Sequence, residues 1–434
     1  MLFRSRGSLY PLSYGGVVRF VAEGELYRQA GVTPTYANNE HSVRQRLPRT
    51  VILLGLVSFF NDLASDMVIP LIPIVLAGVL SAGPVVLGLI EGVADAVASF
   101  LKLWAGRHSD SLGGKRKGLT FAGYTLSNIT RPLLGLAGSW PMVLFLRSVD
   151  RVGKGIRSAP RDALVADTTP PELLGRAYGF HRMLDNGGAV GGALLAAAVL
   201  SFTALSLAQI ILLSAVPGFV ALILVLAVRE PAARPRPTVK PPLLTWAALT
   251  PTVRRYLGVL VILTFAKASE TFIVLRGYEM GLSVTHLLLL WAALNFCKAI
   301  TASLGGEAAD RLGRRRIMLL SWVAFGLAYS FLGHISNTAA FWVVTLAYGL
   351  ASGFSEGAER ALIADLAPEE SRGTAFGWYY LTAGFAAIPA GLLFGGLWHW
   401  AGAAVAFSMA GAFAGLAALL LYVGFDPDHR ASTR

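Results

Sequence analysis

The sequence predicts an all-α integral membrane protein with twelve transmembrane helices in two pseudo-symmetric six-helix bundles. Three observations support this fold class: an apolar composition, twelve apolar stretches of spanning length, and an internal repeat. Of the 434 residues, 55% are hydrophobic and only 14% are charged, whereas soluble domains carry about 25% charged residues. A chain this apolar needs a membrane as its solvent.

Each expected span holds roughly the 20 mostly apolar residues that a helix needs to cross the hydrocarbon core. Pro70 and Pro73 predict a bend near the end of the first span. The spans cover residues 50–80, 83–105, 117–138, 140–165, 175–200, 206–228, 255–277, 284–304, 316–334, 338–363, 373–397 and 401–424.

The connections between spans predict the orientation. Lys and Arg gather in alternate connections, for example at 115–117 and 314–316, and are scarce in the others. By the positive-inside rule, both termini lie in the cytoplasm and the protein resides in the cell (inner) membrane. Because the net charge of +12 sits in these loops, we expect a lipid bilayer and a small-molecule substrate as partners, no nucleic acid, and a monomer.

The predicted organisation has five parts. They are a cytoplasmic tail (1–49), an N-terminal bundle (50–228), a Pro-rich cytoplasmic linker (229–254), a C-terminal bundle (255–425) and a short cytoplasmic tail (426–434). Residues 1–49 contain no apolar run long enough for a signal peptide. The single cysteine, Cys297, excludes an intrachain disulfide, and we expect no metal or cofactor.

The two halves repeat each other after their second and fourth spans. The first repeated motif combines glycines, an aspartate and a basic run: Gly106, Asp110, Gly113, Lys115 and Arg116 recur as Gly306, Asp310, Gly313, Arg314 and Arg315, and Arg311 stands where the first copy has Ser111. The second runs from Gly155 to Gly179 in one half and from Gly353 to Gly377 in the other, and it includes Asp167 and Asp365 at equivalent positions. Such a parallel duplication is the design in which transport sites form between halves.

On these residues the chain resembles the major facilitator superfamily over roughly residues 50–425. Arg151, Lys154 and Gly155 resemble a second family motif, and Gly187, Gly188, Gly191 and Gly192 resemble, without its proline, a glycine-rich motif of antiporters. Ser111 stands where the family usually has arginine. The resemblance implies alternating access, a cytoplasmic latch between the halves formed by the first motif, and peripheral third, sixth, ninth and twelfth helices.

Ionisable residues inside spans are costly and mark function. The fourth span carries a charged stripe, and the third, sixth, ninth and twelfth spans are expected to hold almost no internal charge. The candidates for substrate binding and proton coupling are Asp62, Asp66, Glu91, Asp95, Arg147, Asp150, Arg151, Arg182, Asp185, Lys267, Glu270, Asn295, Lys298, Glu356 and Glu359. We expect the acids and bases of the cavity to be about balanced, so they predict no substrate charge.

A structural interpretation competes with this functional one. For residues at the cytoplasmic helix ends, including Arg157, Arg161 and Asp162, we favour structural ion pairs. His181 is expected to be a structural hydrogen-bonding partner. For mid-depth residues we favour function. Asp62 and Asp66 lie one helical turn apart, where two ionised carboxylates repel each other.

We therefore expect a secondary active carrier that exports a small organic solute by proton antiport, driven by the proton gradient. The alternative is proton-coupled uptake or facilitated transport of a small polar or anionic solute. No phosphate-binding loop supports an ATP-driven pump. Residues 353–357 match the Gly-x-Ser-x-Gly string of serine hydrolases around Ser355, but inside a helix, so we expect no enzyme.

Overall fold

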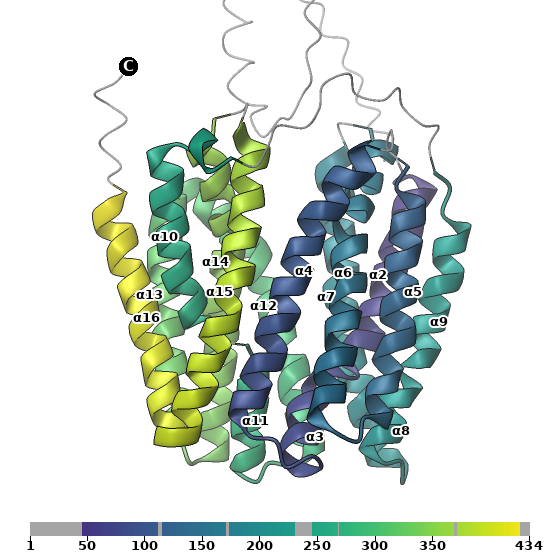
Figure 1. Ribbon diagram of the computed structural model, residues 1–434, viewed down its shortest axis with the longest axis vertical. Helices are drawn as coiled ribbons and strands as arrows, with labels where there is room; N and C mark the ends of the chain where they lie inside the picture. The colour runs from purple at the N-terminus through teal and green to yellow at the C-terminus, as the bar shows by residue number, and fades with distance from the viewer. Residues whose placement is uncertain are drawn as a thin grey trace, which may run out of the picture. The chain divides into compact units, whose positions relative to one another are not determined.

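The structure, a computed structural model, describes residues 46–111, 115–170, 173–230, 245–267, 269–368 and 371–425. Over these residues the chain crosses the bundle twelve times (Figure 1). Tails 1–45 and 426–434 and linker residues 231–244 lie outside the described ranges. The division of the chain at the predicted domain boundaries therefore stays a prediction.

The first six crossings are formed by α2 (Arg49–Asp66) with η1 (Ile69–Leu71) and α3 (Ile72–Gly78), α4 (Pro84–Ser111), α5 (Lys117–Leu133) with η2 (Leu134–Leu136), α6 (Trp140–Thr168), α7 (Leu174–Phe202), and α8 (Leu207–Leu213) with α9 (Ala215–Ala227). After the short η4 (Trp246–Ala248), the second six are α10 (Pro251–Ala266) with α11 (Thr271–Glu279), α12 (Val284–Leu312), α13 (Arg314–His334), α14 (Thr338–Leu366), α15 (Arg372–Ala401) and α16 (Ala403–Gly424).

The predicted fold class is confirmed, since every expected span coincides with one crossing. Ten of these helical segments are long and apolar enough to span a membrane. The other two crossings, α5 and α6, are recognised by their position in the order of helices. Their apolar character is reduced by polar and charged side chains that face the interior, among them Asn128, Arg131, Arg147 and Asp150.

The first helix of each half is interrupted. Between α2 and α3 the break follows Asp66 and contains Pro70, which agrees with the predicted bend. Between α10 and α11 the helix stops at Lys267 and resumes at Thr271, which the sequence analysis did not predict. These matching breaks place Asp66, Lys267 and Glu270 beside the space between the halves.

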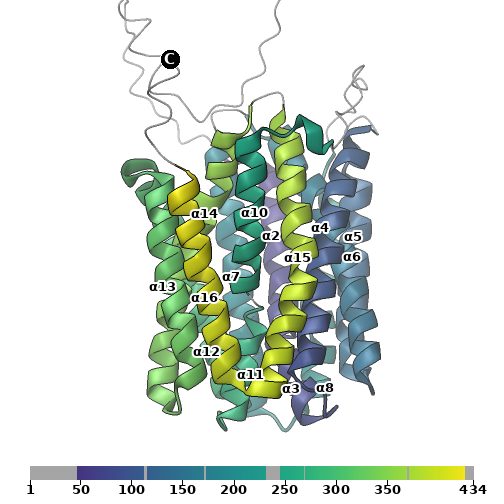
Figure 2. The same ribbon diagram turned by 60° about the vertical axis from the view of Figure 1, so that its left-hand side comes forward.

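The halves touch most closely toward the end of the bundle at which α16 begins, which we call the distal end; the end at which α16 finishes is the terminal end (Figure 1). There α4 and α15 are in backbone contact. A Cβ at Gly88 would lie 2.0 Å from the carbonyl oxygen of Gly391, and one at Gly395 would lie 2.4 Å from that of Pro84. Figure 2 shows these two helices side by side in a second view.

The four motif glycines of α7, at 187, 188, 191 and 192, divide into two pairs. A Cβ at Gly188 or Gly192 would lie 2.3 Å from the carbonyl oxygens of Phe59 or Leu63 on α2, so both positions are required for helix packing. At Gly187 and Gly191 the nearest side-chain atoms would lie 3.7 and 3.8 Å away, which is ordinary contact. Packing thus explains only half of this motif.

This difference predicts the outcome of alanine substitution. Gly188→Ala and Gly192→Ala should lower stability by ~1–3 kcal/mol, because α7 must move away from the α2 backbone. Gly187→Ala and Gly191→Ala are the matched controls and should leave it unchanged. Thermal unfolding of the detergent-purified variants measures the effect; equal melting temperatures for all four would contradict the packing described here.

Candidate functional site

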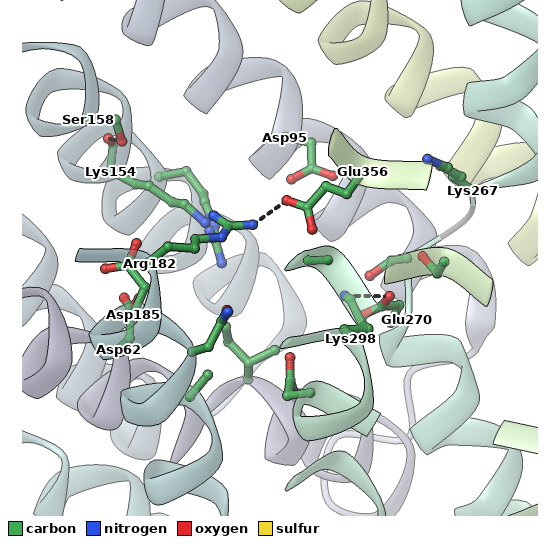
Figure 3. A pocket seen from close by; sticks show the side chains of 18 of the residues that line it. Asp62, Asp95, Lys154, Ser158, Arg182, Asp185, Lys267, Glu270, Lys298 and Glu356 are labelled. Atoms are coloured by element: carbon green, nitrogen blue, oxygen red, sulfur yellow. Dashed lines mark hydrogen bonds and ion pairs between the residues drawn. The ribbon is translucent and has the colours of Figure 1, made fainter. Parts of the chain in front are cut away.

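A cavity of about 670 Å³ lies between the halves (Figure 3). Its described lining comes from both bundles and includes ten Lys or Arg side chains but only seven Asp or Glu side chains. The expectation that acids and bases are balanced is therefore wrong for the cavity, because Lys102, Arg157, Arg161 and Arg360 also face it. The surplus of positive charge favours an anionic group on whatever binds there.

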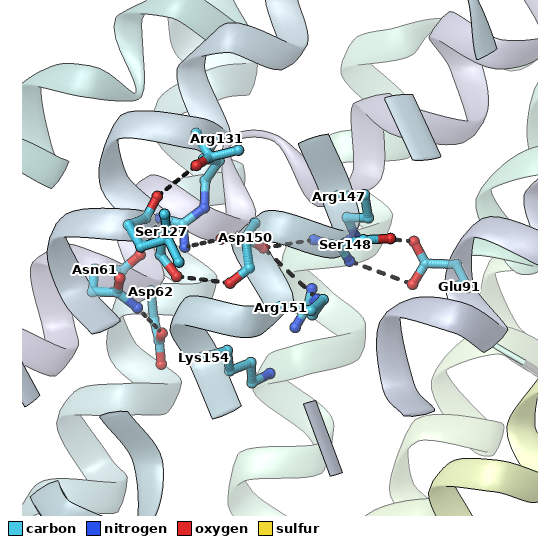
Figure 4. Close-up of polar contacts among 12 residues, drawn as sticks. Asn61, Asp62, Glu91, Ser127, Arg131, Arg147, Ser148, Asp150, Arg151 and Lys154 are labelled. Carbon is cyan, nitrogen blue, oxygen red and sulfur yellow. Dashed lines mark hydrogen bonds and ion pairs between the residues drawn. The ribbon is translucent and has the colours of Figure 1, made fainter. Parts of the chain in front are cut away.

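In one cluster around Asp150, the charged side chains form ion pairs with one another (Figure 4). Asp150 on α6 accepts from Arg131 at 3.1 Å and from Arg147 at 3.4 Å, and Arg151 approaches it to 3.7 Å. Arg147 also donates to both carboxylate oxygens of Glu91 at 3.3 Å. Asp150 is 1% exposed and Arg147 2%. These residues fit the structural interpretation, since buried charges need partners of this kind.

Arg131 was missed by the sequence analysis, and the expectation that the third span carries almost no charge is wrong. Its guanidinium also donates to the Asn61 carbonyl oxygen and to the Asn128 side chain. The polar run from Ser127 to Arg131 was the available signal, because such residues on one face of a span must point inward.

Arg157 and Arg161, which were expected to form structural ion pairs at a cytoplasmic helix end, line the cavity. Arg157 stacks over the Tyr124 ring at 4.5 Å and donates to Ser127. Arg161 pairs with Asp162 at 2.8 Å and approaches Asp185 to 3.9 Å. His181 bonds Ser58 at 3.0 Å and lies 3.5 Å from Asp185, as expected for a hydrogen-bonding partner.

In the second half the candidate acids are all paired. Lys267 donates to Glu359 at 2.6 Å, and Glu359 also accepts from Trp322. Lys298 donates to both oxygens of Glu270 at 2.8 Å. Asn295 bonds the carbonyl oxygen of Trp291 within α12.

One ion pair joins the two halves inside the cavity. Arg182 of α7 donates to Glu356 of α14 (Figure 3), and Arg360 donates to the same oxygen at 2.6 Å. A second polar contact across the halves runs from Trp291 of α12 to Asp66 of α2 at 2.8 Å.

Asp62, Asp66, Asp95 and Lys154 have no oppositely charged side chain within ion-pair distance in the described part of the chain. Among these residues Asp62 accepts from the adjacent Asn61 side chain at 2.8 Å, and Asp66 accepts from Trp291. Asp95 and Lys154 are exposed to the cavity. Arg157 and Lys154 act electrostatically on Asp62 from a longer distance, as do Arg151 and Lys154 on Asp95. The cavity therefore contains two acids, Asp62 and Asp95, that no cation neutralises at contact distance, and one ammonium group, that of Lys154, without an ion pair.

The repeated loop motifs form equivalent pairs at the terminal end. Arg116 contacts Asp167 at 3.0 Å in the first half, and Arg314 contacts Asp365 in the second. Each pair joins the loop after the second helix to the fourth helix of the same half, so these pairs do not form the expected latch between halves. Gly313 has φ of 94°, a conformation that suits glycine.

The other residues of the repeated loop motifs make weaker contacts, lie within helices or are exposed. Arg314 approaches Asp310 to 3.8 Å, and Arg315 donates to the Tyr422 carbonyl oxygen. Gly106 and Gly306 lie within helices, while Lys115 and Arg311 are exposed. Gly113 and the Asp110 side chain lie outside what the structure describes.

Ser355 lies within α14, fully buried, and its hydroxyl donates to the Ser352 carbonyl oxygen at 3.2 Å. This is the geometry of a helix residue and differs from the strand-to-helix turn of a hydrolase nucleophile. Among the described residues no group of three or more His, Cys, Asp or Glu side chains could hold a metal ion.

Twelve crossings in two related halves, closed around a charged central cavity, define a polytopic membrane carrier. The family model described as Major Facilitator Superfamily matches residues 54–275 and 256–434. The chain belongs to the major facilitator superfamily.

Three comparisons illustrate this membership. The chain is 30% identical over 392 residues to an uncharacterized MFS-type transporter of Methanocaldococcus jannaschii, covering 88% of this chain and 94% of the relative. It is 34% identical over 131 residues to the multidrug resistance protein MdtG of Yersinia enterocolitica, or 29% of this chain and 31% of MdtG. A mutant form of the nucleoside transporter NupG has the same fold, with a TM-score of 0.74 and 13% identity, over 87% of this chain and 100% of that one.

The pairing pattern predicts which acids stabilise the fold. Asp150→Asn should cost ~3–5 kcal/mol, because three buried arginines lose their shared acceptor. Asp95→Asn, which breaks no ion pair among the described residues, is the matched control. Thermal unfolding and membrane yield of the two variants give the comparison. A stable Asp150→Asn protein, or an Asp95→Asn protein that fails to accumulate, would contradict the assignment.

Proposed function

We propose that the protein is a secondary active carrier that works by alternating access and couples proton movement to transport of a small polar organic solute bearing an anionic group. One observation carries this proposal. Asp62, Asp95 and Lys154 line the cavity and interact electrostatically, but Lys154 forms an ion pair with neither acid. Every other charged side chain in the described lining of the cavity forms an ion pair or lies over an aromatic ring.

The chemistry follows from electrostatics within one site. When Asp62 and Asp95 are ionised, they attract Lys154 and repel an incoming anion. When they carry protons, the ammonium group of Lys154 is free to bind a carboxylate or phosphate of the solute. Arg151 and Arg157 line the same wall and add positive charge. Proton and anion then bind together, and this supports co-transport, the second of the two functions that the sequence left open.

The second candidate is export by proton antiport. A cationic solute would compete with protons for Asp62 and Asp95, so that each would leave as the other bound. The similarity to the multidrug resistance protein MdtG over about a third of the chain supports this candidate. In either case we propose that the protein lies in the cell membrane with its terminal end toward the cytoplasm, because the basic loops are at that end.

The test uses purified protein in proteoliposomes that enclose a pH-sensitive dye, with carboxylated, phosphorylated and cationic solutes added in turn. We expect anionic solutes to drive protons in the same direction as the solute. Lys154→Gln should abolish this flux by removing the anion's partner, whereas Lys117→Gln, at the start of α5 and outside the cavity lining, should not. Asp62→Asn should lose pH-driven accumulation but keep part of the solute-for-solute exchange.

Opposite directions of proton and solute flux, seen with cationic solutes, would establish the antiport candidate in place of the first. Lys154→Gln protein that transports anions at the wild-type rate would refute the role of the ammonium group. Normal pH-driven transport in both Asp62→Asn and Asp95→Asn would refute the coupling assignment.

A further inference from the structure

A second cavity opens on the side of the bundle between α7 and α12. It has a volume of about 700 Å³, within the range of ligand pockets. Its walls are apolar over most of their length, from Met183 and Leu194 on α7 to Phe296 and Ile300 on α12. These four side chains are 45–59% exposed, as expected for residues that meet lipid. We call this cavity the lateral groove.

The lateral groove continues into the central cavity at one end. Arg182, Asn186, Glu356 and Arg360 line both spaces. Two guanidinium groups and one carboxylate meet there, so this end carries a net positive charge. Both arginines are about half exposed and available to an additional anion. A groove with an apolar body and a cationic end complements an anionic amphiphile.

The glycines of the groove are not explained by packing. A Cβ at Gly179 would have no atom within 4 Å, and those at Gly187, Gly191 and Gly357 would have only ordinary contacts. Larger side chains could therefore stand at these positions without disturbing the helices. Because glycine has no side chain, these positions keep the groove open.

The length of the groove is close to the hydrocarbon depth of one leaflet, about 15 Å. At 1.5 Å rise per residue, Arg182 lies about 12 Å from the terminal end of α7, and Leu194 lies about 18 Å farther along. α7 has 29 residues and is about 43 Å long, so a hydrocarbon core of about 30 Å begins roughly 7 Å from its end. Arg182 is then about 5 Å inside the head-group boundary, and the groove runs from there to about 8 Å beyond the midplane.

We propose that the lateral groove binds an anionic phospholipid of the leaflet at the terminal end. Its phosphate contacts Arg182 and Arg360, and one acyl chain lies along Gly187 and Gly191. Basic pockets between transmembrane helices are suited to such head groups. The phosphate and Glu356 compete for Arg182, so the lipid weakens the ion pair between the halves. This site is independent of which solute the central cavity carries.

Native mass spectrometry of the full-length protein tests this proposal, with equimolar phosphatidylglycerol and phosphatidylcholine of identical acyl chains. We expect about fivefold more retained phosphatidylglycerol, the factor that one net cation near a membrane surface contributes. Gly191→Leu, which fills the groove, and Arg182→Gln should reduce the ratio to near one. Gly258→Leu is the matched control, since this α10 glycine is exposed and equally free of contacts. It should retain the wild-type ratio.

Glu356→Gln separates lipid binding from a purely structural role of the ion pair. It breaks the same pair as Arg182→Gln but removes the competitor of the phosphate, so retained phosphatidylglycerol should stay at the wild-type level or rise. Equal retention of both lipids by the wild-type protein would overturn the proposal. So would the same phosphatidylglycerol ratio in Gly191→Leu and Gly258→Leu, or a dimer that Gly191→Leu dissociates, which would mean that a second copy occupies the groove.

Discussion

Five cationic side chains run along α6 through the middle of the bundle, and the surrounding helices are arranged around the cost of burying them. Each charge removed from water costs several kcal/mol unless partners compensate. Asp150 lies between three arginines, Glu91 receives Arg147 from the neighbouring helix, and the Tyr124 ring covers Arg157. The packing of α4, α5 and α6 against one another is inseparable from this pairing. The charged interior in turn requires a wet cavity between the halves.

The same constraint separates structural from functional charges. Arg131 and Arg147 form ion pairs with carboxylates, as do Lys267 and Lys298 in the second half. Two acids and one lysine on the cavity side, Asp62, Asp95 and Lys154, have no direct partner. In the proposed function these three can change their charge during a transport cycle without loss of the fold. The Arg182 to Glu356 pair and the Asp66 to Trp291 contact are different again, because they join the halves and would break in the proposed cycle.

Much of this architecture could be predicted from the sequence. Hydropathy and loop charge predicted twelve spans, and the repeat predicted equivalent loops, which the structure shows as the Arg116–Asp167 and Arg314–Asp365 pairs. Partner choice could not be predicted, because it depends on how helices face each other. Arg131 was overlooked for this reason, and Lys154 was noted in a motif and in the charged stripe of the fourth span but not among the candidate site residues. The break at Lys267 carries no proline signal. The two roles of the α7 glycines became separable only when the distances to α2 were known.

The central claim is that proton binding occurs at the acids that have no cationic partner, and infrared difference spectroscopy measures this without knowledge of the substrate. Spectra of the purified protein between alkaline and acidic pH report carboxyl groups that become protonated. We expect a protonated-carboxyl band in the wild-type protein that weakens in the Asp62→Asn, Asp95→Asn double variant and disappears when Asp66→Asn is added, because Asp66 also has no cationic partner among the described residues. The band should be retained in Glu270→Gln, whose acid is paired with Lys298. An unchanged band in the double variant, or its loss in Glu270→Gln, would contradict the account.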